Sequence, residues 1–204
     1  FHNAPVEGSD FVCATLDFEG GMLHPLVRAL PPLLVLPLSA VHGLEHTLTL
    51  LFAETERVRC GQRLLADRLL DVLLVQLLRW MLDHPQQGTA APGLLLGLSD
   101  ARIARTLVAL HEQPGEPWTL AAMARQAGMS RSAFAPCFKS LLGVTPADYL
   151  ARWRVALACK MLRDGRAVKF IADALGYATA SSLSRAFTQE TRCSPRAWLQ
   201  SQSA

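Results

Sequence analysis

The sequence has few of the features by which secreted, membrane-spanning or metal-binding proteins are identified. No secretory signal peptide is visible, and the strongly apolar runs, such as residues 72–78, are too short to span a bilayer. There is neither a CxxC pair nor a Cys/His spacing typical of metal sites. The cysteines form an odd, scattered set without a disulfide framework: Cys13, Cys60, Cys137, Cys159 and Cys193. These absences predict a cytoplasmic protein in a reducing compartment, with no membrane partner.

Motifs of the common enzyme classes are also missing. We find no nucleophile elbow, no glycine-rich phosphate loop and no paired catalytic motif. His42 and His46 have a spacing that can hold a metal on a helix, but no third ligand follows at a suitable spacing. Cys13 could sense oxidants if it were exposed with a depressed pKa, although a buried strand cysteine is the more ordinary interpretation. The sequence therefore predicts no catalytic residue, no metal and no cofactor.

Charge is distributed unevenly along the 204 residues, half of which are apolar. From Glu116 onward there are 12 lysines and arginines against 5 acidic residues, a balance of +7. The part before Glu116 has 8 against 12, a balance of −4, so that the whole chain carries +3. The length suits two small domains. A basic half predicts a polyanionic partner, and an acidic half predicts a body that does not adhere to DNA.

One pattern occurs twice in the basic half, at an offset of 48 to 49 residues. The first copy contains Ala124, Gly128, Phe134, Phe138, Gly143 and Thr145-Pro146; the second contains Ala172, Gly176, Leu183, Phe187 and Ser194-Pro195. Each copy predicts a helix-turn-helix. A short amphipathic helix ends at a glycine, which adopts the left-handed conformation easily. Ser130 or Thr179 can then cap a second helix, whose apolar residues are four apart and share one face.

The repeat resembles the DNA-binding domain of AraC/XylS-type transcription regulators over about residues 116–200. The stretches that carry the resemblance are Trp118-Thr119-Leu120, Gly128-Met129-Ser130-Arg131-Ser132, Gly143-Val144-Thr145-Pro146, Tyr149-Leu150, Arg152-Trp153-Arg154, Ile171-Ala172, Gly176-Tyr177 and Ser184-Arg185-Ala186-Phe187. The resemblance implies a mostly α protein with an all-helical double helix-turn-helix domain at residues 116–204. It further implies sequence-specific binding of double-stranded DNA and regulation of transcription. A helical bundle with an accidental repeat is the alternative.

In helix-turn-helix proteins the second helix of the motif enters the major groove. The candidates are residues 131–142 and 180–191. We expect DNA contacts from their polar faces and from the intervening helix: Arg131, Ser132, Ala135, Lys139, Arg152, Arg154, Ala180, Ser181, Ser184 and Arg185. Arg185 is the best candidate for a base edge, since arginine pairs bidentately with guanine; a phosphate contact or a salt bridge is its alternative. The helix between the motifs, Ala147–Arg163, is expected to be roughly 25 Å long, and Arg152 and Arg154 on it are candidates for phosphate contacts or ordinary surface arginines.

Pro136 occupies the position in the first copy that Arg185 occupies in the second. A proline past the first turn removes one helical hydrogen bond and can kink the helix. The resembled family usually has larger polar or basic residues at this part of the first motif. We therefore expect weak base reading by the first motif, with Arg131, Ser132 and Lys139 contacting mostly phosphates.

Residues 1–40 contain strand-like pieces at residues 11–16 and 33–36, with prolines that exclude long helices. Cys13, His24-Pro25-Leu26 and Leu30-Pro31 resemble the cupin-like sensor domain of one AraC subgroup, although that subgroup usually has Cys-Gly where this chain has Cys13-Ala14. The resemblance implies an α+β remnant of a sensor domain that responds to an unknown small-molecule or redox effector. Because the chain opens in what looks like the middle of a domain, we expect it to be a fragment.

Residues 41–115 are expected to form a helical dimerisation and linker region. Helices are predicted at residues 41–56 and 62–83, and the second has apolar residues nearly all round, so that a core or a homodimer interface explains it equally well. Residues 86–93 have the composition of a linker. Ser99 is expected to cap a helix over residues 100–113. Residues 114–117 are expected to form a hinge.

Two other functions are compatible with parts of the pattern. An enzyme could retain a metal in the cupin-like part, where His2, His24, His42 and His46 are scattered candidates. An interaction protein with a degenerate helix-turn-helix would account for Pro136. The main hypothesis is the transcription regulator, for which RNA polymerase is a further candidate partner.

Overall fold

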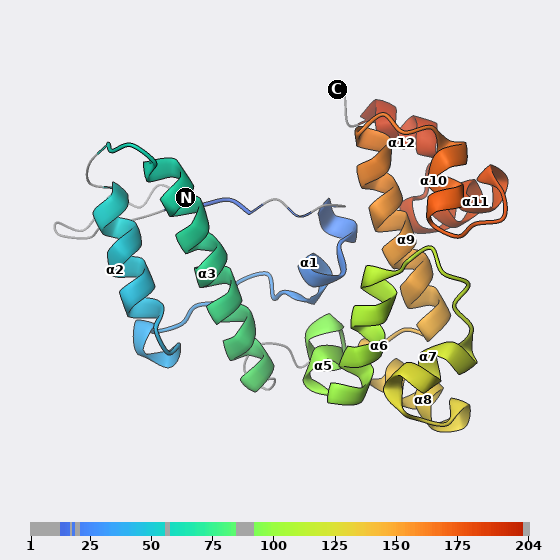
Figure 1. The fold of residues 1–204 in the computed structure, drawn as a ribbon, viewed down its shortest axis with the longest axis horizontal. Coiled ribbons are helices and arrows are strands. Elements are labelled where there is room, and N and C mark those ends of the chain that lie inside the picture. The colour runs from blue at the N-terminus through green and yellow to red at the C-terminus, as the bar shows by residue number, and fades with distance from the viewer. Residues whose placement is uncertain (1–12, 17, 19–20, 56–57, 85–91, 202–204) are drawn as a thin grey trace. The chain divides into compact units, whose positions relative to one another are not determined.

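The computed structural model describes residues 13–16, 18, 21–55, 58–84 and 92–201, which form helices and connecting segments without a strand (Figure 1). The chain divides into two compact units. The first comprises the described residues of Phe1–Asp17 and Leu33–Trp80, and the second comprises those of Phe18–Pro32 and Met81–Ala204. The prediction of a mostly α protein is confirmed.

The predicted strands are wrong wherever the structure describes them. Residues 13–16 and 33–36 have no regular structure, and Phe11 and Val12 lie outside the described residues. A strand is stable only when a second strand supplies its hydrogen bonds, and none is available in the described part of the chain. The proline-rich stretch instead forms short helical turns: η1 (Gly21–Leu23), α1 (Pro25–Ala29) and η2 (Leu38–Ala40).

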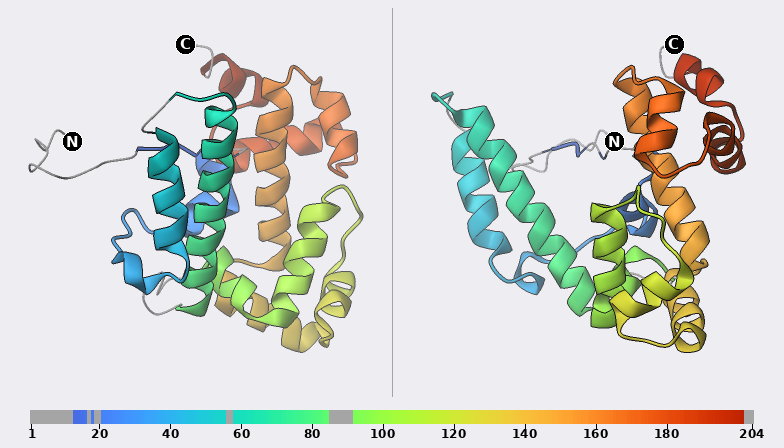
Figure 2. Two further views of the ribbon diagram at one scale, coloured as in Figure 1. Left: turned by 60° about the vertical axis from the view of Figure 1, so that its left-hand side comes forward. Right: turned by 45° about the vertical axis from the view of Figure 1, so that its right-hand side comes forward.

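The first unit consists mainly of α2 (Leu44–Thr55) and α3 (Gln62–Asp83), which lie side by side (Figures 1 and 2). The bounds of α3 are those predicted. Its buried residues include Leu73 and Trp80, and Val41, Leu44 and Leu51 are buried around α2. Several apolar residues of α3 nevertheless remain exposed, Leu65 and Val72 among them, so that burial within this unit accounts for only part of its apolar surface.

The second unit is built around the long helix α9 (Pro146–Arg163). Helices α7 (Leu120–Ala127) and α8 (Arg131–Leu142) pack near the start of α9. Helices α10 (Val168–Ala174), α11 (Ala180–Thr191) and α12 (Pro195–Ser201) pack near its end (Figures 1 and 2). The bounds of α8 and α11 agree with the sequence prediction, because the caps and glycines that fix them are local signals.

Two further helices, α5 (Leu94–Ser99) and α6 (Ala101–Glu112), belong to the second unit. The sequence did not predict α5. Ser99 is not the cap of α6: Asp100 is, because its carboxylate accepts the N–H groups of Arg102 at 2.9 Å and Ile103 at 3.3 Å. The Arg102 side chain holds the pKa of Asp100 down at about 2. The Ser99 hydroxyl turns back and donates to the Leu96 carbonyl.

Helix α6 supplies core residues to the helix-turn-helix half. Ile103, Leu107 and Leu110 are fully buried, and α6 packs against α7. The hydroxyl of Thr106, also fully buried, donates to the Met123 carbonyl at 3.1 Å. The second unit therefore includes helices on both sides of the predicted boundary at residue 116, which remains a prediction about where the DNA-binding domain begins.

Candidate nucleic-acid interface

The first helix-turn-helix, α7 and α8, is fixed by local caps. Thr119 caps α7, Gly128 ends it with φ +66°, and Ser130 caps α8 by accepting the Ala133 N–H at 3.3 Å. Phe134 and Phe138 are fully buried beneath α8, with ring centroids 5.5 Å apart. The predicted caps and the predicted apolar face are confirmed.

The second motif, α10 and α11, repeats this construction. Thr179 accepts the Ser182 N–H at 3.1 Å, and the Ser182 hydroxyl accepts the Thr179 N–H in return, which completes a reciprocal capping box. Leu183 and Phe187 are buried against α9 and α12. Helix α11 ends at Thr191, and its C-cap Arg192 is a non-glycine residue with φ +64°.

The solvent face of α11 is wider than the sequence analysis proposed. Ser181 and Arg185 are exposed, while Ala180 and Ser184 are half-buried. A shallow hollow on this face is lined by five residues: Ser184, Arg185, Thr188, Gln189 and Arg192. The last three of them were not among the predicted DNA contacts, although Arg185, Gln189 and Arg192 follow the i, i+4, i+7 spacing of one helix face.

The solvent face of α8 carries fewer hydrogen-bonding groups. Arg131, Ser132 and Lys139 are exposed, and Ala135 is half-buried. Pro136 is exposed in the middle of α8, and the helix continues through it to Leu142. Proline provides no N–H, so the Ser132 carbonyl lacks its usual helical donor. The helix is thus complete in extent but presents an apolar ring where α11 presents Arg185.

Arg152 and Arg154 of α9 have intramolecular partners. Arg154 donates from Nε to the Pro114 carbonyl at 2.7 Å and from Nη2 to the Glu116 carbonyl at 2.9 Å, and its guanidinium lies over the Tyr177 ring. Burial lowers the pKa of Arg154. The Nε of Arg152 lies 3.5 Å from Glu190 Oε1. Arg154 therefore fastens the hinge at residues 114–117 to α9 and the second motif.

An aromatic cluster fixes the middle of α9. The His111 ring stacks on Trp153 with centroids 4.4 Å apart, and its Nε2 lies 2.8 Å from the Tyr149 hydroxyl. Burial, with a smaller effect of nearby His24, lowers the pKa of His111 to about 4, so the imidazole is neutral at neutral pH. Burial also raises the pKa of Tyr149. The His24 ring meets Trp153 edge-on at 5.6 Å, which brings the N-terminal segment onto this cluster.

The residues considered for metal and redox chemistry do not converge. His42 and His46 are exposed, His2 lies outside the described residues, and the part of the chain that the structure describes contains no group of three potential ligands. Cys13 is exposed rather than buried. Burial raises the pKa of Cys159 to about 12, which keeps that thiol protonated. None of the described helices is long and apolar enough to cross a membrane.

Comparison with known proteins gives matches to both halves of the chain. A cupin model matches residues 2–83, and a helix-turn-helix domain model matches residues 123–201. A protein named as an AraC-like transcription regulator in Streptomyces lividans is 37% identical over 79% of this chain and 54% of its own length. The HTH-type transcriptional regulator AlkR of Acinetobacter baylyi is 31% identical over 88% of this chain and 59% of its own length.

Among solved structures, a transcriptional regulator with an AraC-type DNA-binding domain from Chromobacterium violaceum is 21% identical, with a TM-score of 0.47. The match covers 50% of this chain and 92% of that one. The chain spans little more than half the length of the curated relatives that it matches.

Proposed function

We propose that this chain, which belongs to the AraC/XylS-type family of transcription regulators, regulates transcription by binding double-stranded DNA in a sequence-specific manner. The observation that carries the proposal is the pair of capped helix-turn-helix motifs at the two ends of α9, each with an exposed second helix. The basic balance of residues 116–204 supports a polyanionic partner. No enzyme activity is proposed, because the relatives are named as transcription regulators.

Helix α9 sets the spacing of the two reading helices. Its 18 residues make it about 27 Å long at 1.5 Å per residue. Successive major grooves on one face of B-DNA are about 34 Å apart, and α8 and α11 pack near opposite ends of α9. We therefore propose that α8 and α11 enter neighbouring major grooves on one face of the duplex.

Helices α8 and α11 are proposed to contribute differently to DNA recognition. Helix α11 would read bases through Arg185, with Ser181, Ser184 and Gln189 beside it. Helix α8 would mainly hold phosphates, through the exposed Arg131, Ser132 and Lys139. Arg154 is proposed to act by holding the hinge and not by touching DNA, since its guanidinium already serves two carbonyls.

DNA binding by the 204-residue chain is expected to weaken steeply with salt. Neutralising about four phosphates would lower the affinity roughly 100-fold between 50 and 200 mM salt, because condensed counterions are released on binding. A gel-shift titration at both concentrations measures this. Binding that ignores salt, or no binding to any sequence in a random pool, would instead favour an interaction protein with a degenerate helix-turn-helix.

The sensory part of the proposal concerns the N-terminal half. The match of residues 2–83 to a cupin model supports a region that senses a small-molecule or redox signal. RNA polymerase is proposed as the protein partner of the DNA-bound regulator. The cytoplasm is proposed as the compartment in which the regulator acts. The identity of the signal depends on the binding sites that the chain offers.

We also propose that α3 pairs two subunits. Leu64, Leu65, Val72 and Val75 are each at least 45% exposed, and their spacings of 7 and 11 residues place them along one stripe of α3. Leu73 of the same helix is buried within the first unit. The exposed stripe, not the side that carries Leu73, is thus the proposed interface.

Replacing Leu65 and Val72 together by aspartate is expected to raise the dimer dissociation constant by more than about 100-fold, because a carboxylate buried in an apolar interface costs several kcal/mol. Analytical ultracentrifugation gives the constant. Leu50→Asp is the matched control, since Leu50 is equally apolar and exposed but lies on α2. A dimer that persists in a folded double variant would rule out this stripe.

A further inference from the structure

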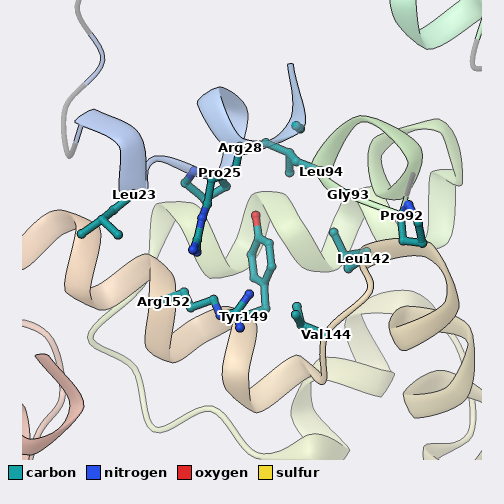
Figure 3. A pocket seen from close by; sticks show the side chains of 11 residues that line it. Leu23, Pro25, Arg28, Pro92, Gly93, Leu94, Leu142, Val144, Tyr149 and Arg152 are labelled. Atoms are coloured by element: carbon teal, nitrogen blue, oxygen red, sulfur yellow. The ribbon is translucent and has the colours of Figure 1, made fainter. Parts of the chain in front are cut away.

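We propose that a pocket on the second unit binds a small organic carboxylate with an apolar body. The pocket lies among the N-terminal segment η1–α1, the start of α5, the end of α8 and the first turns of α9 (Figure 3). It measures about 250 Å³. A cavity of roughly 150 Å³ accommodates benzene, so this pocket has room for a ring and a charged group.

The apolar walls of the pocket are formed by seven of its eleven lining residues: Leu23, Pro25, Leu94, Leu142 and Val144, together with Ala29 and Pro92. These side chains come from η1, α1, α5 and α8 and from the connecting residues Pro92 and Val144. Leu94 and Leu142 are themselves part of the buried core. Walls of this kind favour a hydrocarbon body over a hydrated ion, because apolar surface on both partners leaves water on binding.

The polar groups of the pocket are cationic or neutral. Figure 3 shows Arg28 of α1 and Tyr149 and Arg152 of α9 extending toward the same space. Among the described residues, the lining includes no acidic side chain, and Arg28 has no ion pair. Of the two lining arginines, Arg152 is paired with Glu190 at 3.5 Å. A carboxylate could accept paired hydrogen bonds from the guanidinium of Arg28.

One of these groups is incompletely bonded. Nε of Arg152 is buried and pairs with Glu190 Oε1 at 3.5 Å, but within the described part of the chain it has no acceptor in hydrogen-bond geometry. A buried donor without a well-oriented acceptor is unfavourable. The Tyr149 hydroxyl can also donate to the ligand when it accepts its 2.8 Å hydrogen bond from His111. The pocket therefore presents donors to an anion.

The position of the pocket gives a bound ligand contacts in both matched regions. Leu23, Pro25 and Arg28 lie in the segment that matches a cupin model, and Leu142, Val144 and Tyr149 lie in the match to a helix-turn-helix domain. A ligand held by both would bridge the N-terminal segment and the first motif. The inference goes beyond the proposed function, since binding to the pocket can be measured without DNA.

Isothermal titration calorimetry of the 204-residue chain with cyclohexanecarboxylate tests the proposal. We expect one site per chain. The isosteric alcohol cyclohexylmethanol is expected to bind at least about tenfold more weakly, because hydrogen bonds to a charged acceptor are about twice as strong as neutral ones. Arg28→Gln should weaken the carboxylate about tenfold, and Arg28→Lys should restore part of the loss because it keeps the charge.

Arg63→Gln is the control variant, since Arg63 is equally exposed but lies on α3 and does not line the pocket. It should leave carboxylate binding unchanged. Three results would each overturn the proposal. The carboxylate and the alcohol could bind with equal affinity, the Arg28→Gln variant could bind the carboxylate as tightly as the unchanged chain, or the carboxylate could fail to bind. A chain that binds the carboxylate but no DNA would refute the proposed function alone, and the reverse result would refute the pocket alone.

Discussion

Replacing Arg185 by alanine is expected to lower affinity for the preferred DNA site by about 5- to 150-fold, equivalent to roughly 1–3 kcal/mol, and to relax base choice at the position that it contacts. Arg185 is exposed in the N-terminal half of α11, on the face that also carries Gln189 and Arg192. Its planar group offers five donors, and the residue at the equivalent place in α8, Pro136, offers none.

Two variants separate base reading from general charge effects. Arg196→Ala removes the same charge from an exposed position on α12, outside α11. It should weaken binding without changing the selected sequence. Pro136→Ala restores the missing backbone N–H of α8 and removes no polar side chain, so it should leave the selected sequence nearly unchanged and can raise affinity. Selection of sites from a random DNA pool with all three variants gives the comparison.

The assignment of the reading helix depends on which variant alters the selected sequence. If Pro136→Ala rewrites that sequence and Arg185→Ala leaves it intact, α8 and not α11 is the dominant reader. If Arg185→Ala and Arg196→Ala have the same effect on affinity and neither changes selection, Arg185 contacts phosphate. Both results would be compatible with DNA binding, because they concern only which motif reads the bases.

Helices whose ends carry their own signals could be predicted from the sequence. Ser130 and Gly143 bracket α8, Thr179 caps α11, and each signal acts within a few residues of the helix that it fixes. The bounds of α8 and α11 were accordingly predicted without error. The spacing of Phe134 and Phe138 also predicted the buried face of α8, because a helical period depends only on neighbouring residues.

Features that depend on distant parts of the chain could not be predicted in this way. The apolar run at residues 33–36 is a local pattern, but a strand needs a partner that the local sequence does not specify. The partners of Arg154 at Pro114 and Glu116 are 40 and 38 residues away, so the same side chain looked like a phosphate contact. The carboxylate pocket likewise joins residues 23–29 to residues 142–152.

A close backbone approach ties the hinge to the second motif. Gly176, with φ +71°, follows α10, and a Cβ built there would lie 2.2 Å from the carbonyl oxygen of Gly115. A Cβ on Gly115 would lie 2.5 Å from the carbonyl oxygen of Ala174. Backbone atoms cannot move aside as a flexible side chain can. Arg154 holds the two residues that flank Gly115, Pro114 and Glu116, so the hinge has little freedom to retreat.

Gly176→Ala is therefore expected to reduce the free energy of unfolding of the second unit by about 2–5 kcal/mol. Roughly 1–2 kcal/mol comes from placing a Cβ in the left-handed region, and about 1–3 kcal/mol comes from the forced backbone shift. Gly165→Ala is the matched control. Gly165 has φ +76° after α9, and nothing lies within 4 Å of a Cβ built there, so it should lose only the first contribution.

Urea unfolding followed by tryptophan fluorescence compares the two variants, because Trp118, Trp153 and Trp198 all lie in the second unit. The difference between Gly176→Ala and Gly165→Ala isolates the clash with Gly115 from the cost of the left-handed backbone. Equal losses in the two variants would show that the hinge moves away from α10 at no cost. In that case Arg154 does not clamp the hinge, and the assignment of its guanidinium to a structural role instead of a phosphate contact would have to be abandoned.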